Sequence, residues 1–206
     1  EKIEMAQQLE KLGVDIIEAG FAIASPMDHK SVKAIAGAVE NCTVASLARC
    51  VKGDIDAAWD AVKDARHPRI HVFLATSDIH MEYKLQMTRP RVLERISEMV
   101  AYAKSFCEDI EFSAEDASRS EPEFLAQCYT RAIAAGATTI NVPDTVGYST
   151  PQEMSDLIRY LKGHVAGIGN VDISVHCHDD LGMGVANSLA CIMAGISAVN
   201  INYTAT

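Results

Sequence analysis

The sequence lacks the features of membrane, secreted and nucleic-acid-binding proteins. No apolar run approaches the roughly 20 residues that a membrane span needs. The first residues, EKIEMAQQLEKLG, have the pattern of a helix and not of a signal peptide. Acidic residues outnumber basic ones by 28 to 18, and the formal net charge of −10 argues against a general nucleic-acid binder. We therefore expect a cytoplasmic protein without membrane or nucleic-acid partners.

Several motifs with a known mechanism are also missing. The sequence has no G-x-S-x-G elbow, no H-E-x-x-H pair and no phosphate-binding glycine loop after its first predicted strand. None of the six cysteines forms a C-x-x-C pair, so we expect six reduced thiols. The cysteines and the methionines are interpreted as packing residues, the latter including Met81, Met87, Met154, Met183 and Met193.

One pattern is present throughout the chain: a short apolar run, a polar turn, and then an amphipathic stretch that ends at glycine or proline. Seven runs are predicted to be strands: 14–21, 43–48, 69–75, 109–114, 138–143, 173–178 and 198–203. Six further stretches are predicted to be helices: 27–39, 54–65, 90–107, 121–135, 151–162 and 183–194. The alternation of strands and helices requires a parallel sheet covered by helices.

The helix predicted over 90–107 shows how the pattern is recognised. Its apolar residues recur at spacings of three and four and form one stripe: Val92, Ile96, Met99, Val100 and Ala103. Pro90 fits the first turn, where its missing N–H has no cost. Pro151 opens another predicted helix, with Ser149 and Thr150 as capping candidates.

Polar residues gather near the carboxyl ends of the predicted strands, where a (β/α)-barrel builds its site. These residues are Glu18, His71, Glu115, Asp144 and His178. We therefore predict an α/β protein of the TIM (β/α)8-barrel class, with residues 1–206 forming one partial catalytic domain. Because such a barrel usually has about 250 residues, we expect its first strand and last helix to be missing. We also expect no regulatory domain within this chain.

His176 and His178 are the sharpest candidates for chemistry. Since side chains alternate along a strand, both imidazoles face one side and Cys177 faces the other. Two neighbouring imidazoles suit Zn, Mn, Fe or Co, with oxygen ligands completing the site. The alternative is a pair of strand histidines satisfied by hydrogen bonds, which is the commoner case for an isolated H-x-H.

Two further strand ends carry polar side chains. Ser113 and Glu115 share a face, where the carboxylate could orient a substrate or transfer a proton. Asp116 and Ser118 are instead interpreted as caps of the next helix. The segment from Asn141 to Gly147 includes Pro143, Asp144 and Thr145, and by itself it indicates a turn with polar groups. His71 alone is more typical of a core histidine than of a ligand.

Five segments together resemble the isopropylmalate and homocitrate synthases, within the DRE-type metal-dependent TIM-barrel superfamily. In chain order they are IIEAGFAIASP, TSDIHMEYKLQMT, IEFSAEDASRSEPEFL, TTINVPDTVGYSTP and HCHDDLGMGVANSLA. The resemblance extends from Glu1 to about Val199. The second and fourth segments are most similar to the 2-isopropylmalate synthase branch.

The resemblance implies an acyltransferase that condenses acetyl-CoA with 2-oxoisovalerate. The products would be CoA and 2-isopropylmalate, in the first committed step of leucine biosynthesis. It implies a divalent cation (Mn, Zn or Mg) held by His176 and His178, and Glu115 as a catalytic carboxylate. The 2-oxo acid would be bound by residues His71, Ser113, Asn141, Pro143 and Thr145. A homodimer is also implied.

Three departures from the family pattern bear on these expectations. The family's metal-binding Asp on the first strand and its Asn after the eighth strand have no counterparts here, and the segment 200–206 does not resemble the approach to that Asn. Ala22, Met27 and Asp179 replace the more usual Pro, Gly and Asn. Any metal bound by this chain alone is therefore expected to be held weakly. The alternatives are a homocitrate or citramalate synthase, or a truncated, non-catalytic barrel that binds a 2-oxo acid.

Overall fold

The computed structural model describes residues 1–200, and the predicted alternation of strands and helices is confirmed over that range. The strands are β1 Ile16–Gly20, β2 Thr43–Arg49, β3 Pro68–Ala75, β4 Ile110–Glu115, β5 Thr139–Asp144, β6 Asp172–Cys177 and β7 Ala198–Asn200. Within the described range they are hydrogen-bonded neighbours in chain order, from β1 to β7. The last strand was predicted to reach residue 203, and its final residues lie outside the described range.

The helices fall between the strands, as expected for βα units. The longer ones are α1 Lys2–Leu12, α2 Pro26–Ala36, α3 Lys52–Val62, α5 Arg89–Lys104, α6 Pro122–Ala134, α7 Pro151–His164 and α8 Gly184–Met193. Four short turns of helix complete the set: α4 Asp78–His80, η1 Met81–Leu85, η2 Ala117–Arg119 and η3 Ile168–Asn170. In the described part of the chain, no helix has the length and apolarity needed to cross a membrane.

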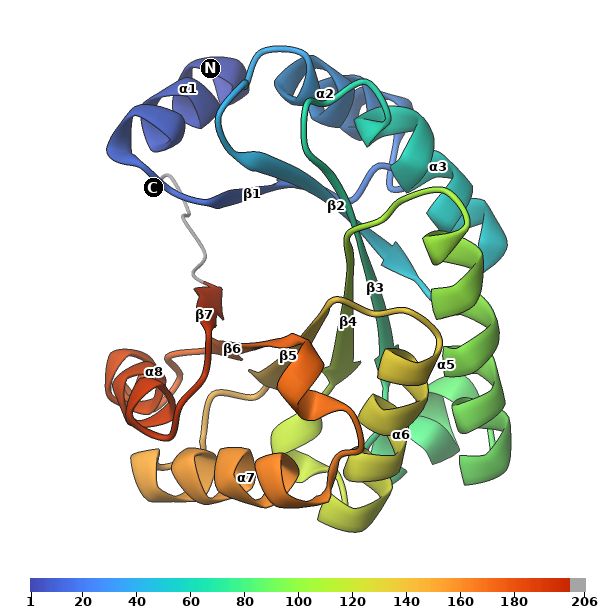
Figure 1. Ribbon diagram of the computed structural model, residues 1–206, viewed down its shortest axis with the longest axis vertical. Helices are drawn as coiled ribbons and strands as arrows, with labels where there is room; N and C mark the ends of the chain where they lie inside the picture. Colours follow the sequence, from blue (N-terminus) through green and yellow to red (C-terminus); the bar gives the residue numbers. More distant parts are fainter. Residues whose placement is uncertain (201–206) are drawn as a thin grey trace. The chain divides into compact units, whose positions relative to one another are not determined.

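The chain forms two compact units. The first comprises Glu1–Phe73 with Glu98–Glu111, and the second comprises Leu74–Ser97 with Phe112 onwards. In the first unit β1 and β2 are parallel, and α2 and α3 pack on them (Figure 1). Its core is apolar and includes Ile17, Val32, Ile35, Val44 and Val62.

The second unit is built on β5, β6 and β7, which run parallel (Figure 1). Helices α7 and α8 pack against each other, and α8 also packs on β6. The Phe112 ring meets the Tyr129 ring edge to face, with centroids 6.2 Å apart, and Tyr129 donates a hydrogen bond to the Asn141 carbonyl at 2.8 Å. This hydrogen bond fixes β5 against α6 at the level of a predicted site residue.

Local signals explain where the helices begin and end. Thr150 caps α7 in a full capping box with Glu153, so this capping candidate is confirmed. The predicted stripe of α5 is also confirmed, because all five of its apolar residues are buried. All six cysteines are free thiols. The packing interpretation of the methionines is wrong for Met193, whose residue is 88% exposed at the end of α8.

Candidate functional site

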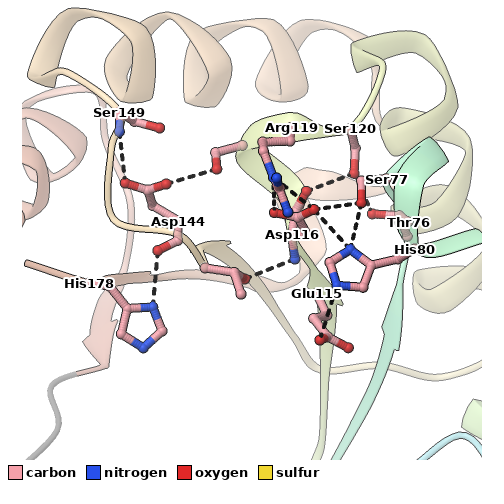
Figure 2. A network of polar contacts seen from close by, with 12 residues as sticks. Thr76, Ser77, His80, Glu115, Asp116, Arg119, Ser120, Asp144, Ser149 and His178 are labelled. Carbon is pink, nitrogen blue, oxygen red and sulfur yellow. Dashed lines mark hydrogen bonds and ion pairs between the residues drawn. The ribbon is translucent and has the colours of Figure 1, made fainter. Parts of the chain in front are cut away.

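The carboxyl ends of β3, β4, β5 and β6 in the second unit continue into loops rich in polar side chains (Figure 2). Parallel strands bring these ends to one edge of the sheet, so residues distant in sequence become neighbours. In register, His176 of β6 lies opposite Pro143 of β5, and Cys177 lies opposite Asp144. The loop after β5 therefore reaches the histidine pair predicted from the sequence.

His176 and His178 face each other, as strand alternation predicts. Their Nε2 atoms lie 3.4 Å apart, and the rings meet nearly at right angles with centroids 4.7 Å apart. Cys177 points to the other side, where burial raises the pKa of its thiol and a hydrogen bond with Ser188 of α8 opposes that rise. The prediction of one shared face for the two imidazoles is confirmed.

The tautomer of His178 follows from its partner. Its Nδ1 lies 3.1 Å from the Asp144 carbonyl oxygen, which can only accept, so Nδ1 carries the proton. The Nε2 lone pair then faces His176. A carbonyl behind a ligating imidazole is the usual outer support of a metal site.

The spacing of the pair fits a shared cation. Two nitrogens bound at roughly 2.0–2.1 Å to one tetrahedral ion lie about 3.3–3.4 Å apart, which matches the observed 3.4 Å. Among residues 1–200, however, no group of three or more His, Cys, Asp or Glu side chains could hold a metal ion. A cation at this place would thus find two imidazole nitrogens and, among residues 1–200, no third ligand from a His, Cys, Asp or Glu side chain.

Asp144 organises the loop behind His178. Its buried carboxylate accepts hydrogen bonds from the Ser118 hydroxyl at 2.8 Å and from the Ser149 backbone N–H at 3.1 Å (Figure 2). Its carbonyl accepts from the backbone N–H of His178 at 3.3 Å, in addition to the imidazole. One aspartate therefore connects the loops after β4, β5 and β6.

Asn141 of β5 and Ser113 of β4 form a buried polar pair. The Asn141 Nδ2 donates to the Ser113 Oγ at 2.8 Å. The Asn141 Oδ1 is buried and has no hydrogen-bond partner among residues 1–200, and such an acceptor costs free energy unless a donor reaches it. A bound molecule with a hydroxyl or an ordered water would supply that donor. Thr145 lies nearby in the chain, and its Oγ1 accepts the backbone N–H of Asp116 at 2.9 Å.

The interpretation of Asp116 and Ser118 as side-chain caps of the next helix is wrong, because Asp116 stands at the N-cap position of η2 but its side chain makes no capping hydrogen bond there. The cap of α6 is Glu121, whose carboxylate accepts the backbone N–H groups of Glu123 and Phe124. Ser118 donates to Asp144 instead. Asp116 is fully buried with a left-handed backbone, φ 66°, so its carboxylate points into the polar network and not at the helix.

Asp116 is the hub of that network (Figure 2). Its carboxylate accepts hydrogen bonds from the Ser77 hydroxyl at 2.5 Å, the Arg119 Nε at 2.8 Å and the His80 Nδ1 at 3.0 Å. Burial alone would raise the pKa of Asp116, but the hydrogen bonds from Arg119 and Ser77 lower it below the ordinary value. Asp116 is therefore held as a carboxylate inside the protein.

Glu115, the last residue of β4, projects beside this hub. Lys84 of η1 donates to both of its oxygens, at 2.7 and 2.8 Å, and the His80 Nε2 lies 3.9 Å from its Oε1. The segment that carries both partners includes one turn of π-helix, a form that occurs often at functional sites. Sequence reasoning missed His80 and Lys84, although the polar run after β3 at a sheet edge was the available signal.

His71 occupies a different position from the one expected. It is the fourth residue of β3 and not its end, and its side chain is buried in the first unit. Its Nδ1 pairs with Glu18 of β1, and Glu111 and Arg69 lie beside it. Burial alone would lower the pKa of His71, but Glu111 and Glu18 raise it to about 9. His71 is therefore an imidazolium at neutral pH.

Most of the predicted site residues thus lie in one connected part of the second unit. Hydrogen bonds or close approach link Ser113 to Asn141, Thr145 to Asp116, and His176 to His178. Pro143 is buried in β5 opposite His176. His71 belongs to the first unit. Their roles toward a substrate remain predictions.

Curated proteins similar to this chain carry the name 2-isopropylmalate synthase. The one from Ruminiclostridium cellulolyticum is 56% identical over 204 residues, which is 99% of this chain and 40% of that protein. The one from Pyrococcus furiosus is 57% identical over 98% of this chain and 40% of its own length. The chain therefore spans about 40% of the length of the curated relatives that it matches.

Solved structures show the fold class. Hydroxymethylglutaryl-CoA lyase from Pseudomonas aeruginosa matches with a TM-score of 0.77 at 20% identity, over 96% of this chain and 67% of that one. The lyase from Brucella melitensis matches with a TM-score of 0.73 at 18% identity, over 96% of this chain and 71% of that one. With the strand order above, this likeness confirms the predicted TIM-barrel class. The family model described as HMGL-like matches residues 1–203, and the chain therefore belongs to the HMGL-like family.

Proposed function

We propose that the protein is a 2-isopropylmalate synthase, which condenses acetyl-CoA with 2-oxoisovalerate and releases 2-isopropylmalate and CoA. The observation that carries the proposal is the histidine pair, whose Nε2 atoms lie 3.4 Å apart in a chain that is 54–57% identical to proteins of that name. The reaction would be the first committed step of leucine biosynthesis. We expect it to take place in the cytoplasm, in a homodimer, as the family resemblance implies.

A divalent cation such as Mn, Zn or Mg would be held by His176 and His178 together with oxygen ligands. When bound, it would polarise the ketone of the 2-oxo acid and stabilise the charge that develops on that oxygen. The contribution of this chain is orientation: Asp144 holds His178 in the tautomer that leaves Nε2 available.

The 2-oxo acid would be bound by Ser113, Asn141, Pro143 and Thr145 of the second unit. The buried Oδ1 of Asn141 supports this assignment, because no donor among residues 1–200 reaches it and a substrate hydroxyl or a water could supply one. Glu115 would accept a proton from the methyl group of acetyl-CoA, and that carbon would then attack the ketone carbon. Hydrolysis of the thioester bond by water would release CoA and 2-isopropylmalate.

The test is CoA release by the full-length protein with added divalent metal, measured with a thiol reagent. We expect turnover with acetyl-CoA and 2-oxoisovalerate to exceed turnover with 2-oxoglutarate or pyruvate. The His178→Ala variant should lose activity by at least about 10²-fold. The His164→Ala variant, which removes an exposed histidine of α7, should retain activity. Turnover that favours 2-oxoglutarate, or an active His178→Ala variant, would refute the assignment.

A further inference from the structure

The geometry around Glu115 points to a proton relay in which His80 works through Glu115 and is held in place by Asp116. We propose that Glu115 receives a proton from the substrate and passes it to the Nε2 of His80. His80 is thus a positioning residue that restores the carboxylate of Glu115. The inference rests on the proposed function only in assigning the substrate proton to Glu115.

The tautomer of His80 follows from its two neighbours. The single hydroxyl hydrogen of Ser77 is donated to the Asp116 Oδ2 at 2.5 Å, so the Ser77 Oγ can only accept from His80. The His80 Nδ1 lies 2.8 Å from that Oγ and 3.0 Å from the same Asp116 oxygen. Both are acceptors there, and Nδ1 must therefore carry the proton. The Nε2 atom is left with its lone pair.

That lone pair is directed at Glu115. The His80 Nε2 lies 3.9 Å from the Glu115 Oε1, which is too long for a hydrogen bond. Both side chains are 21% exposed, so a rotation of the Glu115 side chain or one water molecule can close the gap. Lys84 donates to both oxygens of the same carboxylate.

The backbone around the relay is unusual at two adjoining places. Asp116 adopts φ 66°, a conformation that non-glycine residues rarely hold. His80 itself directly precedes the π-helical turn η1, which is followed by Gln86 with φ 52°. Strain of this kind is kept where the surrounding structure requires it, and it is frequent at active sites. Here the left-handed backbone of Asp116 directs its carboxylate at the Nδ1 atom of His80.

The charges balance through the transfer. The transfer starts from the Asp116 carboxylate, from Glu115 with the proton that it received from the substrate, and from His80 with its proton on Nδ1. The proton on the Glu115 Oε1 moves to the His80 Nε2, the Oε1–H bond breaks, and the imidazolium is stabilised by the buried Asp116 carboxylate, as in an Asp–His pair of a hydrolase. The charged groups that surround His80 are Glu115, Asp116, Arg119 and Lys84. On the adjoining helices, Arg89 forms ion pairs with Asp78 and Glu121.

The decisive variant is His80→Asn in the full-length protein with its metal. The asparagine amide nitrogen can still donate to Asp116, as Nδ1 does, but Nε2 is gone. We expect kcat/KM to fall by about 10²-fold, and the acidic limb of its pH profile to lose one ionisation. The His164→Asn variant should change neither quantity. If His80 only supports the fold, His80→Asn will keep the wild-type rate and pH profile, and the proposal is overturned.

A second measurement does not depend on turnover. Carbethoxylation of histidine by diethyl pyrocarbonate, resolved by mass spectrometry of peptides, reports how modification of His80 depends on pH, with His164 as the internal control. In Glu115→Gln the midpoint of the His80 profile should move to lower pH, because a negative charge beside the imidazolium is lost. An unchanged midpoint would refute the coupling. A wild-type protein without CoA release would instead refute the proposed function, so the two failures are distinguishable.

Discussion

Replacement of Gly147 by alanine should destabilise the protein through a clash with the backbone of His178. Gly147 has φ +63°, and an added Cβ would lie 2.4 Å from the Asp180 Oδ2 and 2.9 Å from the carbonyl carbon of His178. The exposed Asp180 side chain can rotate away at little cost. The His178 backbone cannot, because its N–H and its imidazole are both bonded to the Asp144 carbonyl.

Two free-energy costs add in the Gly147→Ala variant. The left-handed backbone costs an alanine about 1–2 kcal/mol, and displacement of a packed backbone segment costs about 1–3 kcal/mol more. Gly182 provides a matched control, since its φ is +69° but an added Cβ would have no neighbour within 4 Å. Gly182→Ala should therefore show the backbone term alone.

The assay is urea unfolding of the wild type and both variants, followed by circular dichroism. Gly147→Ala is expected to lose about 1–3 kcal/mol more free energy of unfolding than Gly182→Ala. It should also show weaker metal binding by calorimetry, because the backbone of His178 must move. Equal losses in the two variants would show that the contact between Gly147 and His178 imposes no constraint, and would refute the reasoning.

Three other perturbations test separate parts of the structure. Thr150→Ala removes the capping box of α7 and should cost about 1 kcal/mol in urea unfolding, whereas Gln152→Ala in the same turn should cost less; equal costs would contradict the role of the cap. The pKa of His71 is raised to about 9 from about 6.5 in an unfolded chain. Its contribution to the free energy of unfolding is therefore complete below about pH 6.5 and is lost as the pH rises through 9. The free energy of unfolding should fall by roughly 3 kcal/mol over that range, and His71→Asn should abolish this part of the pH dependence. Asn141→Leu removes a buried acceptor that has no partner among residues 1–200, and it should raise KM for 2-oxoisovalerate about tenfold, or ~1.4 kcal/mol, with a smaller change in the urea midpoint. A loss of stability without a change in KM would contradict a binding role.

The site was only partly predictable, and the residues show why. His176 and His178 were found because strand alternation is a local rule that holds whatever the strand packs against. The position of His71 within β3 was missed, because the end of a strand is decided by its hydrogen bonds to neighbouring strands. Asp116 was assigned to the wrong partner for a related reason: its left-handed backbone, φ 66°, turns the carboxylate away from the next helix.

Local patterns in the sequence predicted the order of strands and helices, the stripe of α5, the capping of α7 and the shared face of the histidine pair. These features depend on side-chain spacing and on contacts within a few residues. Which loops meet depends on the three-dimensional fold: Ser77 and His80 lie 39 and 36 residues from Asp116 in sequence, and Asp144 lies 34 residues from His178. Such contacts arise when parallel strands align their carboxyl ends. The tautomers of His80 and His178 were therefore set by partners that no local pattern identifies.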